Sequence, residues 1–162
     1  MMGKDSHMQT SEAGIAFIAK NEGDCLNEKS DNTGPQIGHG HDLTGPEQAT
    51  LLVYGIDISA GITPAQADYI LQRDLATIYD PALNRLQAQG LIPAGVSQNQ
   101  WDSLADFAYN DGSANCATML HHGWALVPQE MMLWVWGKVN GVEVKIAGLV
   151  ARRQAEVSLF NS

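Results

Sequence analysis

The stretch TPAQADYILQRDLATIYD, residues 63–80, contains the strongest helix signal in the chain. Thr63 can cap the helix N-terminus, Pro64 suits the first turn, and Gln66 completes a capping box with Thr63. Asp74 lies on the apolar face of this helix, where a carboxylate needs a partner. The same face carries, at helical spacing, Ala67, Ile70, Leu71, Leu75 and Ile78. A long amphipathic helix is therefore the first element of the predicted fold.

More helices are predicted on both sides of this segment. Ser11 can cap a helix that ends within residues 21–23, and Ser97 with Gln100 forms a second capping box. The helix after Ser97 should stop near Gly112, which suits a C-cap. Residues 46–54 either form a helix after Thr44 or belong to a loop. Further helices are predicted at residues 83–86, 118–122, 128–136 and 148–160.

The segment DCLNEKSDNTGPQIGHGHDL, residues 24–43, differs from the rest because Gly, Asn, Asp and Ser are frequent in it. This composition predicts turns with a small strand or hairpin. Asn140-Gly141 is a second tight-turn signal. Helices outnumber strands, so the predicted fold class is α+β, mostly α-helical, with a small N-terminal β-hairpin patch.

Length and charge limit the possible functions of the chain. Its 162 residues suit one domain, which we expect at residues 9–162, after a vector-derived leader at residues 1–8. A net charge of −9 argues against nucleic-acid binding. The longest uncharged apolar stretch, residues 131–136, is too short for membrane insertion, and no secretory signal pattern is present. Cys25 and Cys116 do not make a disulfide framework, although a single bridge between them stays open.

Two acidic residues suggest a glycosidase, because cleavage of a glycosidic bond usually requires two carboxyl groups. Glu22 ends an amphipathic helix, where one side can be apolar, and Asp31 follows in the polar segment. Asp24 and Glu28 compete for the same roles, and a solvated acidic loop is the simpler interpretation of the spacing alone. The histidines lack metal-ligand spacing, so neither a metal nor another cofactor is predicted.

A family resemblance supports the glycosidase interpretation. Eight residues separate Glu22 from Asp31, and the run IGHGH follows at residues 37–41. This segment resembles the active-site stretch of the phage-type lysozymes, glycoside hydrolase family 24. The stretches ITPAQADYILQRDL, WDSLADFAYNDG and GLVARRQAEVSLF resemble three further helices of that family. The resemblance implies a lysozyme-like two-lobed fold: a small lobe at residues 9–62, an inter-lobe helix at 63–80 and a helical lobe at 81–162.

The resemblance also implies roles for individual residues. Glu22 would be the general acid and Asp31 the second carboxylate in cleavage of the β-1,4 bond between N-acetylmuramic acid and N-acetylglucosamine. Gln36 stands one residue earlier than the family's threonine, so it is a candidate for the third catalytic position and the stereochemical outcome stays open. We expect the glycan to contact His39 and Asn110. An ion pair between His41 and Asp74 would support the site structurally.

Two alternatives to a hydrolytic lysozyme follow from the same residues. A lytic transglycosylase would use Glu22 without a second carboxylate, and a non-catalytic module would only bind peptidoglycan. The expected partner is the glycan strand of peptidoglycan, bound by a monomer, with an immunity or delivery protein as a further candidate. Without a signal peptide, we expect synthesis in the cytoplasm and action in the periplasm or on the cell wall, after holin release of an endolysin or delivery of an antibacterial effector by a secretion system.

Overall fold

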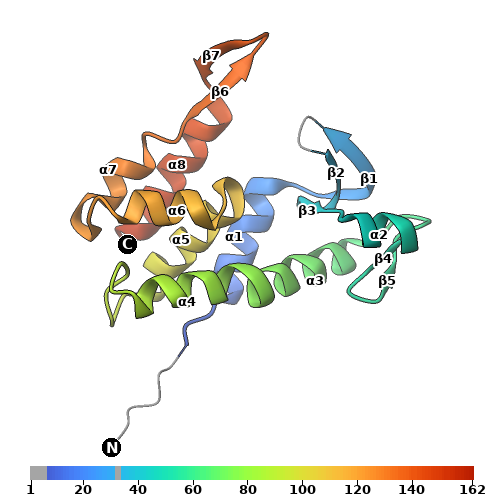
Figure 1. Ribbon diagram of the computed structural model, residues 1–162, viewed down its shortest axis with the longest axis horizontal. Helices are drawn as coiled ribbons and strands as arrows, with labels where there is room; N and C mark the ends of the chain where they lie inside the picture. Colours follow the sequence, from blue (N-terminus) through green and yellow to red (C-terminus); the bar gives the residue numbers. More distant parts are fainter. Residues whose placement is uncertain (1–6, 32–33) are drawn as a thin grey trace, which may run out of the picture.

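The computed structural model describes residues 7–31 and 34–162, with the exception of the Asp31 side chain. A long helix connects two lobes (Figure 1). It consists of α3 (Pro64–Asp74), a π-helical segment (Leu75–Tyr79) and α4 (Asp80–Ala88). The capping box of Thr63 and Gln66 at its start is confirmed. The helix continues past residue 80 to Ala88, and so includes the predicted short helix at residues 83–86.

The π-helical segment explains why the helix tolerates Pro81 and why one apolar prediction is wrong. The backbone N–H of Asp80 donates to the carbonyl of Leu75, five residues earlier. This wider turn precedes Pro81, which has no N–H to donate. It also rotates the apolar face, so Ile78 is 49% exposed instead of lying inward with Ala67 and Leu71.

The small lobe contains the predicted strands and its own core. Strands β1 (Cys25–Asp31), β2 (Gly34–Gly38) and β3 (His41–Asp42) form an antiparallel sheet. The ambiguous segment after Thr44 divides into helix α2 (Gly45–Thr50) and a hairpin of β4 (Leu52–Val53) and β5 (Ile56–Asp57). Apolar side chains from these elements and from α3 form the core of this lobe: Ile37, Leu43, Val53, Ile58, Ile62, Ala67 and Ile70.

The helical lobe is built around α5 (Gln98–Asp111), whose capping box and C-cap at Gly112 are both confirmed. Helix α1 (Glu12–Glu22), capped by Ser11 as predicted, packs against α5, so it belongs to this lobe although it precedes the small lobe in the chain. Trp101, Leu104 and Phe107 of α5 are fully buried. The remaining helices are α6 (Ser113–Leu120), a short 3-10 turn (Trp124–Leu126), α7 (Val127–Met131) and α8 (Ala147–Phe160).

The predicted helix at residues 128–136 is wrong in its second half. Helix α7 ends at Met131, and β6 (Trp136–Val139) pairs with β7 (Val142–Lys145) in a hairpin that projects from the helical lobe (Figure 1). Asn140 and Gly141 both have positive φ, as a tight hairpin turn requires. The tight-turn signal of Asn140-Gly141 was therefore a better guide to this segment than the helical spacing of its apolar residues. Trp136 lies on a strand and is 51% exposed.

The N-terminal segment and the cysteines complete the description of the fold. Of the leader predicted at residues 1–8, residues 1–6 lie outside the described part. Met8 exchanges two hydrogen bonds with Asn84 and packs against the core of the helical lobe. Cys25 and Cys116 are free thiols, so the bridge left open above is absent. Within the described residues, no helix is both long and apolar enough to cross a membrane.

Candidate active site

Glu22 lies where the two lobes meet, at the last position of α1. Gly23 follows with a φ of 68° and turns the chain away from the helix axis toward β1. The Glu22 side chain is 20% exposed, and its Oε1 atom lies 2.6 Å from Nη1 of Arg152 on α8. Burial raises the pKa of Glu22, Arg152 lowers it, and Asp106 raises it again. The net result is a carboxyl group that keeps its proton at higher pH than a free glutamate.

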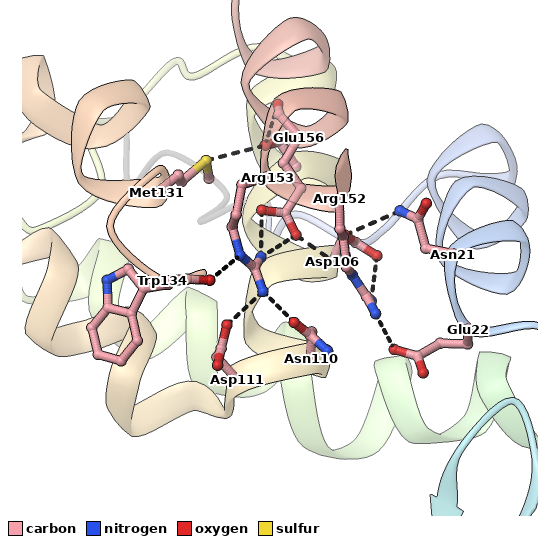
Figure 2. Close-up of polar contacts among 11 residues, drawn as sticks. Asn21, Glu22, Asp106, Asn110, Asp111, Met131, Trp134, Arg152, Arg153 and Glu156 are labelled. Carbon is pink, nitrogen blue, oxygen red and sulfur yellow. Dashed lines mark hydrogen bonds and ion pairs between the residues drawn. The ribbon is translucent and has the colours of Figure 1, made fainter. Parts of the chain in front are cut away.

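A second carboxylate holds Arg152 from the other side (Figure 2). Asp106 on α5 accepts from Arg152 Nε at 3.0 Å and from Nη2 at 2.8 Å. Asn21, next to Glu22 on α1, also donates to Asp106 at 3.3 Å. Three helices thus converge on one guanidinium group, and the side chain of Asp106 is fully buried.

Arg153, the next residue of α8, forms a second group of buried ion pairs and hydrogen bonds (Figure 2). Its side chain is fully buried and donates to Glu156, to Asn110 Oδ1 and, at 2.5 Å, to Asp111 Oδ2. Burial and the neighbouring Asp106 raise the pKa of Glu156, against the opposing effect of Arg153. Asn110, predicted to contact glycan, therefore uses its side-chain oxygen for Arg153.

Sequence reasoning missed this buried network. The closing helix was predicted from Leu149, Val150, Val157 and Phe160, but its fully or nearly fully buried residues are Arg152, Arg153, Glu156 and Phe160. The available signal was the charge spacing, because Arg153 and Glu156 are three residues apart and share one face of a helix. A carboxylate at that spacing can pair with an inward arginine.

The turn between β2 and β3 faces Glu22 from the small lobe. Gly40 in this turn has a φ of 90°, and a Cβ atom at this position would lie 3.4 Å from Glu22 Oε2. Tyr109 of α5 donates to the carbonyl of His39 at 2.8 Å and ties the turn to the helical lobe. This arrangement places Gly40 of the IGHGH run beside the candidate acid, with no room for a larger side chain between them.

His39 is 6% exposed, and protein atoms contact both of its ring nitrogens. Nδ1 lies 2.5 Å from the carbonyl oxygen of Gly23, and Nε2 lies 2.8 Å from Asp68 Oδ1. His39 thus links the end of α1 to α3. A hydrogen bond between glycan and the His39 ring would require one of these nitrogens to leave its protein partner.

The other two candidate catalytic residues lie on the small sheet. Gln36 in β2 donates to Asp42 Oδ1 at 3.2 Å and is half-buried. The backbone of Asp31 ends β1 opposite Gly34. The Asp31 carboxyl group lies outside the described part of the chain, so its distance from Glu22 stays a prediction.

His41 and Asp74 form the predicted contact between the small lobe and α3. His41 Nδ1 lies 2.8 Å from Asp74 Oδ2, and Nε2 lies 3.2 Å from Glu47 Oε1. Tyr54 donates to Asp74 at 2.6 Å, so the inward carboxylate of α3 has two partners. Burial, the largest single effect, lowers the pKa of His41, but the carboxylates of Asp74 and Glu47 together outweigh it and raise the pKa.

This contact predicts a pH-dependent stability. The pKa of His41 is raised in the folded state, so its contribution is fully present below the unfolded value of about 6.5 and is lost as pH rises through the folded pKa. We expect His41→Gln to lower the urea midpoint of unfolding more at about pH 5 than above the folded pKa. His122→Gln, which removes an exposed pair with Glu130, is the control and should change the midpoint little at either pH. Equal losses at both pH values for His41→Gln would contradict the assignment.

Among the residues with described positions, His, Cys, Asp and Glu form no group of three or more that could hold a metal ion. The titratable groups described around Glu22 include Arg152, Asp106 and His39.

Comparisons with known sequences agree on one family. The family profile described as "Phage lysozyme" matches residues 19–156. The chain is 32% identical to the endolysin of Acyrthosiphon pisum secondary endosymbiont phage 1, over 96% of this chain and 99% of that protein. It is 34% identical to the endolysin of Bacillus phage PZA, over 96% of this chain but only 56% of that longer protein.

Solved structures show the same fold. The endolysin from Escherichia coli O157:H7 phage FAHEc1 aligns with a TM-score of 0.72 and 27% identity, over 95% of this chain and 94% of that one. The muramidase domain of SpmX from Asticaccaulis excentricus aligns with a TM-score of 0.72 and 26% identity, over 95% and 98%. These alignments cover both lobes and the helix between them.

Proposed function

Because this chain belongs to the phage lysozyme family, we propose that Glu22 is the general acid with which it cleaves the glycan strands of peptidoglycan. The protein is a lysozyme, a peptidoglycan hydrolase of the endolysin type. The bond that we propose as its target is the β-1,4 bond between N-acetylmuramic acid and N-acetylglucosamine. The observation that carries the role of Glu22 is its position: a half-buried carboxyl group between the lobes, with a raised pKa.

A protonated carboxyl group is what the reaction needs. The departing sugar oxygen is a poor leaving group until it receives a proton, so the acid must still hold one near neutral pH. Burial of Glu22 disfavours its charged form, and Asp106 offsets part of the charge of Arg152. Arg152 at 2.6 Å keeps the side chain oriented while the glycan binds.

We propose Asp31 and Gln36 for the other side of the bond. Asp31 ends β1, and Gln36 lies on β2 of the same sheet, so both belong to the lobe that faces Glu22 across the β2–β3 turn. An ionised Asp31 would activate water or stabilise the positive charge that develops on the sugar ring. Gln36 can hydrogen-bond a water molecule or a sugar hydroxyl.

Product analysis tests this function. Purified peptidoglycan is digested by the wild type and by Asp31→Asn, and the products are identified by mass. We expect reducing N-acetylmuramic acid ends from the wild type, and at least a roughly hundredfold lower rate for Asp31→Asn. Asp24→Asn is the matched control, because Asp24 is an exposed carboxylate in the same segment and should keep full activity.

Each alternative function gives a different result in this experiment. Anhydro ends with little effect of Asp31→Asn would indicate a lytic transglycosylase. Binding to peptidoglycan without products at any pH would indicate a non-catalytic module. Either result would overturn the assignment of a two-carboxyl hydrolase.

We propose the bacterial cell wall as the place of action. The endolysin relatives support the wall as the target. Release through a holin and delivery by a secretion system are the two routes that we consider. A monomeric state and an immunity or delivery protein as partner stay predictions.

A further inference from the structure

The arrangement of Arg152 points to a role for a residue that does not touch the substrate. Resting on the proposed role of Glu22, we infer that Asp106 is a positioning residue that binds Arg152 from behind, aims it at Glu22 and offsets its charge. The arginine can then hold Glu22 in place without removing its proton. Figure 2 shows Asp106, Arg152 and Glu22 in this order.

The geometry of the guanidinium group supports the positioning part of this inference. Asp106 accepts from Nε and Nη2, the two donors on one edge of the planar group. Nη1 then points to Glu22 Oε1. A guanidinium group has a rigid fork of donors, so fixing one edge determines the direction of the remaining nitrogen. Asn21 donates to the same carboxylate and fixes it relative to the end of α1.

The electrostatics support the second part of the inference, that Asp106 offsets the charge of Arg152. A lone arginine this close to a carboxyl group lowers the carboxyl pKa strongly, which would ionise a general acid at neutral pH. At Glu22 the lowering effect of Arg152 is opposed by the charge of Asp106, and burial is the largest effect. Behind this pair, Arg153 is matched by Glu156 and Asp111. Besides Glu22 itself, the two buried arginines face the carboxyl groups of Asp106, Asp111 and Glu156, so the charge of Arg152 does not act on Glu22 uncompensated.

None of the other titratable groups that face Glu22 supplies the negative charge that Asp106 provides. They are Tyr79 in the π-helical segment, Tyr109 on α5 and His39 in the β2–β3 turn. Burial raises the pKa of Tyr79 to about 12 and that of Tyr109 further, so both stay neutral at neutral pH. His39, if charged, would add to the effect of Arg152 and increase the need for a compensating anion.

The test is to titrate the Glu22 carboxyl group directly, by its carbon-13 NMR signal, in the wild type and in Asp106→Asn. Asparagine keeps the shape of the side chain but removes the charge that offsets Arg152. We expect Glu22 to titrate at lower pH in the variant. In peptidoglycan digestion the alkaline limb of kcat should move to lower pH, with activity at about pH 7 reduced roughly tenfold and KM little changed. An unchanged Glu22 titration in folded Asp106→Asn would overturn the inference.

Asp102→Asn is the matched control, because Asp102 is also a buried aspartate of α5 but binds Ser11 and Gln98 instead of an arginine. It should leave the titration of Glu22 unchanged, and a shift as large as that of Asp106→Asn would also overturn the inference. The titration needs no turnover, so its result stands even if Glu22 proves not to be the general acid, a question that activity of Glu22→Gln decides.

A second variant covers the case in which Asp106→Asn does not fold. The double variant Asp106→Asn/Arg152→Gln removes both charges and leaves neither unpaired. Since burial is the largest effect at Glu22, and the lowering effects of Arg152 exceed the raising effect of Asp106, we expect its carboxyl group to titrate at least as high as in the wild type. Titration of Glu22 at its ordinary value in the folded double variant would mean that the two charges do not offset each other, and would overturn the inference.

Discussion

Replacing Glu22 by glutamine is expected to abolish peptidoglycan cleavage, with a loss of turnover of roughly 10²–10⁴-fold or more. Glutamine keeps the size of the side chain and can still accept from Arg152, but its amide N–H groups are far too weakly acidic to protonate the departing sugar oxygen. Binding of the glycan should change little, because the shape and the hydrogen-bonding oxygen remain. The measurement is release of soluble muropeptides from purified peptidoglycan under saturating conditions.

The stability of this variant provides a second measurement. We expect Glu22→Gln to lose activity without losing stability. Because the pKa of Glu22 is raised in the folded state, ionisation of Glu22 costs stability as pH rises from the unfolded value through the folded one. Above that range Glu22→Gln removes this cost, so it should unfold at the same urea concentration as the wild type or a higher one. Glu28→Gln, at an exposed position of β1, is the control for both measurements and should change neither. Undiminished cleavage by Glu22→Gln would contradict the catalytic assignment.

The largest expected effect on stability comes from Arg153. We expect Arg153→Met to lower the free energy of unfolding by about 3–5 kcal/mol, because removing one partner of a buried ion pair leaves charge uncompensated. Arg153 is fully buried between α5 and α8 and donates to Glu156, Asp111 and the carbonyl of Trp134. Methionine fills part of the space but satisfies none of these acceptors. The measurement is urea unfolding followed by circular dichroism.

Arg85→Met is the matched control for this second prediction. Arg85 is also a helical arginine, but its side chain is exposed on α4. Its replacement should change the free energy of unfolding by less than about 0.5 kcal/mol. A similar, small effect of both substitutions would show that the buried network around Arg153 contributes little to the stability of the helical lobe.

Local signals in the sequence predicted most helix starts correctly. Ser11, Thr63 and Ser97 each cap a helix as expected, and Gly112 ends α5. These features depend on residues within one turn of each other, because a cap is a hydrogen bond between a side chain and the backbone two or three residues ahead. The hairpin at β6 and β7 was only half recognised, through its turn, because its strands are four residues long and mostly exposed, and only β7 alternates apolar and polar residues.

The contacts between lobes could be predicted only in part. The partnership of His41 and Asp74 followed from the family resemblance and from one carboxylate on an apolar face, but Glu47 and Tyr54 as further partners did not. In the same way, Glu22 was predicted to be the general acid, while Arg152 and Asp106 were not predicted as its partners. These residues lie more than 80 positions from Glu22, and nothing in their own segments indicates the pairing.

What the sequence by itself determined is therefore where most of the helices begin, the polar strand segment and the position of Glu22 at the end of α1. The tertiary structure alone decided which charges surround that acid, where the apolar face turns at Leu75–Tyr79, and that α8 buries two arginines. The physical reason is the separation along the chain over which each effect acts. Capping and periodicity act within a few residues along the chain, whereas the pKa of a carboxyl group depends on burial and on charges that only packing of distant helices brings within a few ångströms.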